Sequence, residues 1–198
     1  MTDRWTILPD PHFAERKADL SHRLRLASQA IHPDHFPALL DPLSESVLRR
    51  GFSEATSHEG SVWLLDAEGK HLIPAFNTGP HASEFVGRFK QPFNRGLIGM
   101  VLASEQPFVE NEVFKNARQD KALDQLLQVQ TYALIAVPFY LFKTCRGVIS
   151  CVQLKAPSSS ESDPPGFTPE HLSSVQCAAG LLSRLLEYHL LSSTVGLE

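Results

Sequence analysis

Residues 96–109 have the sequence GLIGMVLASEQPFV, which predicts a short apolar helix, a polar turn and a brief strand. The opening glycine, Gly96, frees the backbone, and Pro107 closes the turn before the strand. Two apolar segments follow, ALIAVP at residues 133–138 and GVISCVQL at residues 147–154. Both are rich in Val and Ile, and residues 139–146 join them. They therefore predict neighbouring strands of a hairpin.

In this order and spacing, the three segments resemble the GAF domain, a sensory module of signalling proteins. The resemblance covers most of the chain and implies an α+β fold, like that of GAF and PAS domains. It implies an antiparallel sheet of about six strands with helices on both faces, flanked by N- and C-terminal helices. The first and last helices would pack together on one face. A ligand pocket, where one exists, would lie on the other face.

The resemblance also divides the chain into parts. Residues 1–42 are expected to form a helical extension that serves dimerisation, and residues 43–191 the GAF-like domain. Residues 192–198 are expected to form a tail. Its Leu197-Glu198 end is compatible with cloning residues, in which case the natural chain would continue further.

Composition narrows the class of protein. The chain has 198 residues, of which 42% are hydrophobic and 20% charged, as expected for a globular protein. Its net charge of -4 provides no field that would attract nucleic acid. No apolar run approaches the ~20 residues of a membrane span, and the N-terminus lacks an apolar signal core. The three cysteines show no pairing pattern, which favours a reducing cytoplasm.

Periodicity predicts further elements around the deciding segments. Strands over residues 61–66 and 71–76, joined by a turn at 67–70, predict a second hairpin. Residues 77–92 are expected to form a loop. Thr168 is expected to cap the last helix. The other expected elements are helices over residues 11–31, 43–54 and 122–128, a strand over 132–141, a polar segment over 110–120 and a surface loop over 156–166.

Two helices carry apolar residues at alternating spacings of three and four, which is typical of a coiled-coil seam. These stripes predict a dimeric helical bundle. The first stripe has Lys17 as its single misfit, and the second ends on His189. The stripe positions are Phe13, Lys17, Leu20, Leu24, Ala27 and Ile31, then Leu172, Val175, Ala179, Leu182, Leu186 and His189.

A pocket in this fold would be lined by apolar side chains and a few polar groups that orient the ligand. The alternative is that the apolar residues simply fill the space between the sheet and its lid. The candidate ligand-binding residues are Phe76, Phe93, Arg95, Leu97, Phe108, Tyr132, Leu134, Cys151 and Gln153, with Ile98, Leu123 and Leu126 as further candidates.

Two of the polar candidates have specific arguments. Arg95 precedes the helix that begins at Gly96, so it could grip a phosphate or carboxylate beside the helix N-terminus. The alternative is a surface arginine that pairs with Glu84, Glu105 or Glu110. Cys151 and Gln153 lie two residues apart on a strand and so face the same side of the sheet. If that side is the pocket floor, Gln153 could bind a ligand; otherwise it would bond to the backbone of the lid, residues 77–127.

The chain departs from the specialised members of the family. Cyclic-nucleotide-binding GAF domains carry an Asn-Lys pair where this chain has Ala156-Pro157, and an acidic pair where it has His171-Leu172. Bilin-binding members need a cysteine that is absent between Gly96 and Tyr132. Members that reduce free methionine sulfoxide place cysteines around the pocket in a pattern that this chain does not match.

Cys145 lies beside Lys143 and Arg146, and their positive charge would favour a reactive thiolate. The nine histidines include His32 and His35 at a helix break, but no further ligand joins them at zinc-like spacing. We therefore expect no metal site and no catalytic residues.

The sequence predicts a non-catalytic sensory or regulatory domain that binds an unidentified small molecule and signals as a homodimer. The effector would be a kinase, cyclase, phosphodiesterase or transcription activator. Cofactors stay open. The alternatives are a ligand-free dimerisation or interaction module and, as a different class, a thiol redox sensor or enzyme.

Overall fold

A computed structural model describes residues 11–29, 31–155 and 162–196, with the side chains of residues 11–15 left out. Part of the predicted loop over 156–166 and the last two residues of the predicted tail lie outside this part of the chain, as do the polar N-terminus and the side chain of Phe13. The strands are β1 (Glu59–Leu65), β2 (His71–Asn77), β3 (Gln91–Pro92), β4 (Phe108–Glu110), β5 (Gln130–Leu141) and β6 (Thr144–Lys155).

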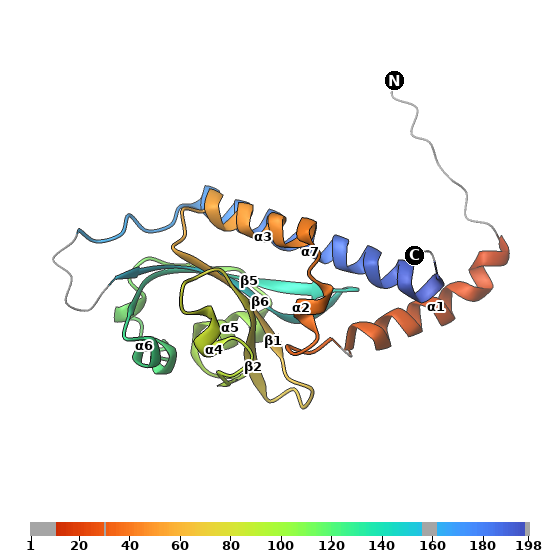
Figure 1. Ribbon diagram of the computed structural model, residues 1–198, viewed down its shortest axis with the longest axis horizontal. Helices are drawn as coiled ribbons and strands as arrows, with labels where there is room; N and C mark the ends of the chain where they lie inside the picture. Colours follow the sequence, from red (N-terminus) through yellow and green to blue (C-terminus); the bar gives the residue numbers. More distant parts are fainter. Residues whose placement is uncertain (1–10, 30, 156–161, 197–198) are drawn as a thin grey trace, which may run out of the picture.

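The strands form one six-stranded sheet in the order β3-β2-β1-β6-β5-β4, and every neighbouring pair is antiparallel. The helices lie on both faces of this sheet (Figure 1). This arrangement confirms the predicted α+β fold. The helices are α1 (Pro11–Gln29), α2 (Phe36–Leu39), α3 (Pro42–Glu54), α4 (Ala82–Phe85), α5 (Gly96–Ser104), the 3-10 helix η1 (Val113–Lys115), α6 (Ala122–Leu127) and α7 (Pro169–Val195).

Local sequence signals account for where the long helices begin. The Asp41 carboxylate accepts a hydrogen bond from the Ser44 amide at 2.6 Å and so caps α3. The predicted cap of α7 is confirmed, because the Thr168 hydroxyl accepts from the His171 amide. The predicted loop over residues 77–92 is more ordered than expected, since it contains α4 and β3.

One face of the sheet carries α3 and α7, which lie side by side across it (Figure 1). Gly51 of α3 allows this close packing, since a Cβ there would overlap the Cβ of Ala178 in α7. We call this the helix face. Its core of buried side chains includes Phe36, Leu48, Phe52, Val62, Ile135, Phe139, Ile149, Val175, Leu182 and Leu186.

The helix face changes the interpretation of the predicted coiled-coil stripes. Val175, Ala179, Leu182 and Leu186 of the second stripe are buried in the core of their own chain. The same spacing of three and four suits any helix that lays one apolar stripe on a sheet, so it does not by itself identify a dimer seam. The second stripe therefore packs within the chain, which corrects the expectation that it faces a second copy.

Beyond the sheet, α7 runs on alongside α1 (Figure 1). The hairpin that joins β5 and β6 contacts both helices. The Phe142 amide donates to Glu187 Oε1 of α7 at 2.6 Å, and Arg146 Nη2 donates to the carbonyl oxygens of Gln29 and Ile31 at 3.1 and 3.2 Å. One end of the two longest strands is therefore fixed to the α1–α7 pair.

The opposite face carries only short elements, namely α4, α5, η1 and α6 (Figure 1). We call it the cavity face. Its buried cluster includes Trp63, Leu72, Leu97, Val101, Leu134 and Val148. Within the described part of the chain, no helix combines the length and apolar character needed to cross a membrane.

Candidate functional site

A cavity of about 100 Å³ lies on the cavity face, between the sheet and the segments around α5 and α6. That volume exceeds the space that a single water molecule requires by several fold. Its apolar wall comes from Trp63, Phe85, Leu97, Ile98, Val113, Leu123, Leu127, Val129, Leu134, Val152 and Leu154. Its polar wall comes from Glu59, Ser61, Asn77, Gln91, Gln119, Asp120, Asp124, Thr131 and Ser150.

The sheet supplies the polar floor from two central strands and β2. Asn77 Nδ2 donates to Ser61 Oγ at 2.9 Å and, more weakly, to Glu59 Oε2 at 3.3 Å. The indole Nε1 of Trp63 donates to Ser150 Oγ at 3.0 Å. Because side chains two residues apart on a strand share a face, Glu59, Ser61 and Trp63 all reach the cavity from β1.

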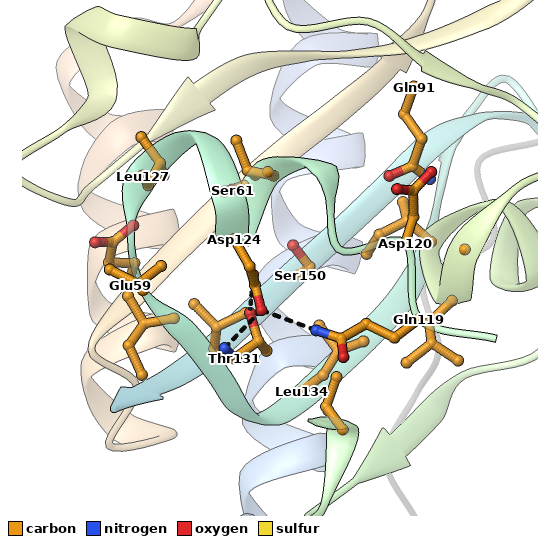
Figure 2. A pocket seen from close by; sticks show the side chains of 18 of the residues that line it. Glu59, Ser61, Gln91, Gln119, Asp120, Asp124, Leu127, Thr131, Leu134 and Ser150 are labelled. Atoms are coloured by element: carbon orange, nitrogen blue, oxygen red, sulfur yellow. Dashed lines mark hydrogen bonds between the residues drawn. The ribbon is translucent and has the colours of Figure 1, made fainter. Parts of the chain in front are cut away.

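Asp124 organises the side of the cavity opposite the sheet floor (Figure 2). Its carboxylate accepts hydrogen bonds from the Thr131 amide at 2.8 Å, the Thr131 hydroxyl at 2.7 Å and Gln119 Nε2 at 2.9 Å. These bonds tie α6 to the start of β5. The tie is polar, because α6 contributes no buried residue to the core.

The third wall is the beginning of α5. Gly96 has a φ of +69°, and a Cβ there would lie 3.1 Å from the Cβ of Asp120. The backbone conformation therefore favours glycine, and a larger residue would also crowd Asp120. Gln91 Nε2 donates to the Arg95 carbonyl oxygen at 2.7 Å and fixes the chain entering this helix.

Arg95 itself lies at the surface rather than in the cavity. Its side chain is 65% exposed, and its Nε lies 3.5 Å from Oδ2 of Asp120. The ion pair that the sequence left open therefore forms with Asp120 and not with Glu84, Glu105 or Glu110. A pair this exposed and long contributes little to stability.

The structure brings some of the predicted ligand-binding residues together and not others. Leu97 and Leu134 line the cavity, as do the further candidates Ile98 and Leu123. Phe108 packs against the core of the cavity face without lining the cavity. Phe93 is exposed at the surface, and so is Leu126.

Phe76, Tyr132, Cys151 and Gln153 lie with the core of the helix face, away from the cavity. Cys151 and Gln153 do share a face, as predicted, but it is the face that α3 and α7 cover. Gln153 Oε1 accepts from the Gly166 amide at 2.9 Å, and its Nε2 donates to the Thr56 carbonyl oxygen at 3.3 Å. Gln153 thus bonds to backbone outside the lid and does not line the cavity, which differs from both alternatives that the sequence left open.

The polar residues of the cavity were not among the predicted site residues. Three of these residues have polar neighbours in the sequence, and acidic side chains in such segments are usually exposed to water. They are Glu59, Asp120 and Asp124. One usable signal was the alternation of Glu59, Ser61 and Trp63, which places a carboxylate on the same face as a large apolar side chain.

The cysteines do not have the environment that the sequence predicted. Burial raises the pKa of the Cys145 thiol despite its neighbour Arg146, so the expected stabilisation of a thiolate is wrong. Burial also raises the pKa of Cys151 to about 12. Neither thiol is favoured as a nucleophile near neutral pH.

Among the described residues, no group of three or more His, Cys, Asp and Glu side chains could hold a metal ion. His32 and His35 lie together, with ring centroids 6.0 Å apart, at the break between α1 and α2. The acidic cavity residues likewise form no metal-binding cluster.

Comparison with solved structures finds GAF domains of the same fold at low sequence identity. The GAF domain of a phosphoenolpyruvate-protein phosphotransferase from Coxiella burnetii matches with a TM-score of 0.60 at 15% identity, covering 93% of this chain and 99% of that one. The blue-light-absorbing PixJ GAF domain of Thermosynechococcus elongatus matches with a TM-score of 0.58 at 17% identity, covering 77% and 88%.

A free methionine-R-sulfoxide reductase from Neisseria meningitidis, solved with its substrate, matches with a TM-score of 0.54 at 16% identity, covering 98% and 99%. No curated protein sequence matches the chain significantly. The family model of the GAF domain, however, matches residues 40–186, which is most of the sequence. The order of the strands, the helices on both faces and this match agree, and the chain belongs to the GAF domain family.

Proposed function

We propose that this protein is a non-catalytic sensory domain that binds a small molecule in the cavity and signals through its long helices. GAF domains are generally sensory or regulatory modules that bind ligands. The observation that carries the proposal is the cavity of about 100 Å³ with both an apolar and a polar wall. Such mixed walls are typical of sites that bury a small ligand and fix its orientation.

The segment most able to respond to a ligand is α6 with its flanking loops. It contributes no buried residue, and Asp124 holds it through polar contacts. Segments with few buried apolar contacts open at low free energy. A ligand that contacts Asp124 or Leu123 in the cavity would therefore shift the population between two arrangements of this segment.

The route from the cavity to the helices follows the two longest strands. Leu134 of β5 and Val152 of β6 line the cavity, and the hairpin at the end of these strands is bonded to α1 and α7. A change in the position of β5 or β6 would thus move the Glu187 and Gln29 contacts together. The α1–α7 pair is the output element of this proposal.

A homodimer would form through the part of α7 that the sheet does not cover. Leu181, Tyr188 and Val195 are exposed and spaced seven residues apart, the period of a two-stranded coiled coil. The partner that receives the signal would be an effector such as a kinase, cyclase, phosphodiesterase or transcription activator. The proposed location is the cytoplasm.

The binding proposal is tested by native mass spectrometry of the purified protein and a thermal-shift screen of small metabolites. The decisive variant is Val152→Phe, which fills the cavity from β6. The control is Val109→Phe, at a half-buried site packed against the core of the helix face. We expect a bound mass or a thermal shift in the unmodified protein and in the control, and its loss in Val152→Phe.

A protein that carries no bound mass and responds to no compound would contradict this proposal. The ligand-free dimerisation module would then be the better account. A thermal shift that survives in Val152→Phe would show that the ligand binds outside the cavity.

The dimer is tested by light scattering over a range of concentrations. Tyr188→Glu and Leu181→Glu place charges on the exposed stripe of α7, and Gln176→Glu places one on another side of the same helix. We expect a dimer that the first two substitutions dissociate and the third leaves intact. A monomer at the highest concentration would remove the dimer from the proposal.

A further inference from the structure

The charge of the cavity wall has one sign. Glu59, Asp120 and Asp124 contribute carboxyl groups, while none of the described residues that line the cavity is a lysine, arginine or histidine. A ligand with a phosphate or carboxylate as its main group would meet repulsion there. The wall therefore selects against anions.

Two of these carboxyl groups already have partners. Asp124 accepts three hydrogen bonds from Thr131 and Gln119. Asp120 accepts from the Ala122 amide at 3.1 Å and lies 3.5 Å from the Arg95 guanidinium. Their charge is partly compensated within the protein.

Glu59 is different. Glu59 is only 7% exposed. Among the described residues, its carboxyl group accepts one hydrogen bond, from Asn77 Nδ2 at 3.3 Å. No cation of the described part of the chain forms an ion pair with it. The nearby His81 is hydrogen-bonded to Glu84, which is the main cause that raises the pKa of His81. The charge of Glu59 raises this pKa only slightly, so His81 is the partner of Glu84 rather than of Glu59.

A second acceptor on the wall also lacks a partner. Oε1 of Gln119 is buried and accepts no hydrogen bond from any residue that the structure describes, although Nε2 of the same side chain donates to Asp124. Leaving a buried acceptor unbonded is destabilising, and leaving a buried charge unpaired is more so. The cavity therefore has a buried carboxyl group without a described cation partner on its sheet floor, and an unused acceptor on the opposite side.

We propose that the ligand is a small organic ammonium ion with a second N–H or O–H donor, and that Glu59 pairs with its charge. An ammonium group brings three donors and a positive charge, which is what Glu59 lacks. The second donor would serve Gln119 Oε1. Leu97, Leu134 and Val152 would cover the carbon skeleton. This inference rests on the proposed function, because it names the ligand class of that cavity.

The volume limits the size of this ion. At about 30 Å³ for each water molecule, a cavity of about 100 Å³ holds about three waters, so an amine the size of an amino alcohol or a small aromatic amine enters only if the α6 segment moves aside. An inorganic metal ion is not the preferred occupant, because the described residues offer no cluster of metal ligands.

Glu59 is held in place by its surroundings rather than by its own hydrogen bond. A Cβ at Gly79 would overlap the carboxyl group of Glu59, so the Gly79 backbone packs directly against it. The Gly79 amide in turn donates to Asn77 Oδ1 at 2.6 Å. The Asn77-Thr78-Gly79 turn therefore positions both the residue that contacts Glu59 and the backbone that restricts it.

The test compares probes of matched shape and different charge by calorimetry on the unmodified protein. The cations are leucinol and tyramine, the neutral analogue is tyrosol, and the anion is hydroxyphenylpropionate. We expect at least one of the two cations to bind. Tyrosol should bind at least about tenfold more weakly than tyramine, and the anion should not bind. Leucine shows whether an added carboxylate is tolerated.

The matched variants are Glu59→Gln, which removes the buried charge, and Glu68→Gln, which removes an exposed charge in the β1–β2 turn. We expect the affinity for the bound cation to fall about tenfold or more in the first and to stay unchanged in the second. Because the charge series needs no variant, a Glu59→Gln protein that fails to fold leaves the test intact.

The outcomes separate this inference from the proposed function. If neither cation binds, or if tyrosol or the anion binds as tightly as tyramine, the ammonium assignment is wrong. If in that case another compound binds and Val152→Phe abolishes its binding, the cavity is still a sensor site. If nothing binds and no bound mass is found, both proposals fail.

Discussion

The two faces of the sheet are built in different ways. The helix face is covered by α3 and the 27-residue α7, whose inner side chains are fully buried against β5 and β6. The cavity face is covered by short helices, and its outermost one, α6, buries no residue. The first face is closed by apolar contact throughout, whereas the second combines a smaller apolar cluster with a segment, α6, that hydrogen bonds hold in place.

This difference separates stability from binding. The buried apolar side chains of the helix face offer a ligand no group to contact, so this face keeps its packing whatever ligand enters the cavity. Hydrogen bonds such as those of Asp124 can be exchanged for bonds to a ligand at little net cost. A GAF domain can therefore change its ligand by altering the cavity face while its helix face preserves the fold.

The largest expected effect tests this division directly. Leu182→Ala, at a fully buried position of α7, should lower the free energy of unfolding by about 2–5 kcal/mol. Leu123→Ala, in the half-buried α6, should lower it by about 1 kcal/mol or less. Chemical denaturation monitored by circular dichroism measures both. Equal losses would mean that the cavity face carries as much of the stability as the helix face.

A smaller effect is expected from two glycines of the helix face. Gly51→Ala inserts a methyl group where α3 meets Ala178, and should cost about 1–3 kcal/mol through overpacking. Gly180→Ala is the matched control, because a Cβ there meets nothing within 4 Å. It should stabilise the protein by about 0.5–1 kcal/mol, since alanine favours the helix. The contrast fails if both substitutions move the melting temperature in the same direction.

The smallest effect concerns the contact that anchors the end of α5 to β5. Burial, and the hydrogen bond that its hydroxyl donates to Glu105 at 2.9 Å, raise the pKa of Tyr140 to about 12. The neutral phenol is therefore favoured in the folded state. Its contribution to stability is complete below the ordinary pKa of 10.0 and is lost as the pH rises through about 12.

Absorbance titration of the phenolate measures this pKa. One tyrosine of the folded protein should titrate late, and Tyr140→Phe should remove that late step. Tyr188→Phe is the control, because Tyr188 is 71% exposed. A late step that persists in Tyr140→Phe would assign the shift to another tyrosine.

The fold followed from the sequence because its signals are local. The glycine at 96, the Thr168 cap and the apolar segments of β5 and β6 each act over a few residues and predicted most elements, while the fold class followed from the resemblance to the GAF domain. The turn of helix over Ala82–Phe85 was missed because four residues are too few for a periodic signal.

The sequence predicted the candidate site less well than the fold, for a physical reason. Alternation shows that Cys151 and Gln153 share a face, but both faces of a central strand are buried here, so alternation cannot say which face holds the cavity. Glu59 and Asp124 were missed because an acidic residue beside other polar residues usually faces water. Only the closure of distant segments over them makes them part of a wall.

The length of α7 has a mechanical consequence. At 1.5 Å per residue, its 27 residues extend about 40 Å, and only the first part rests on the sheet. A rotation of about 5° at the sheet would displace the far end by about 3 Å, roughly the rise of two helical residues. The helix is thus a lever that magnifies a movement too small to disturb the core into one that a neighbouring molecule can detect.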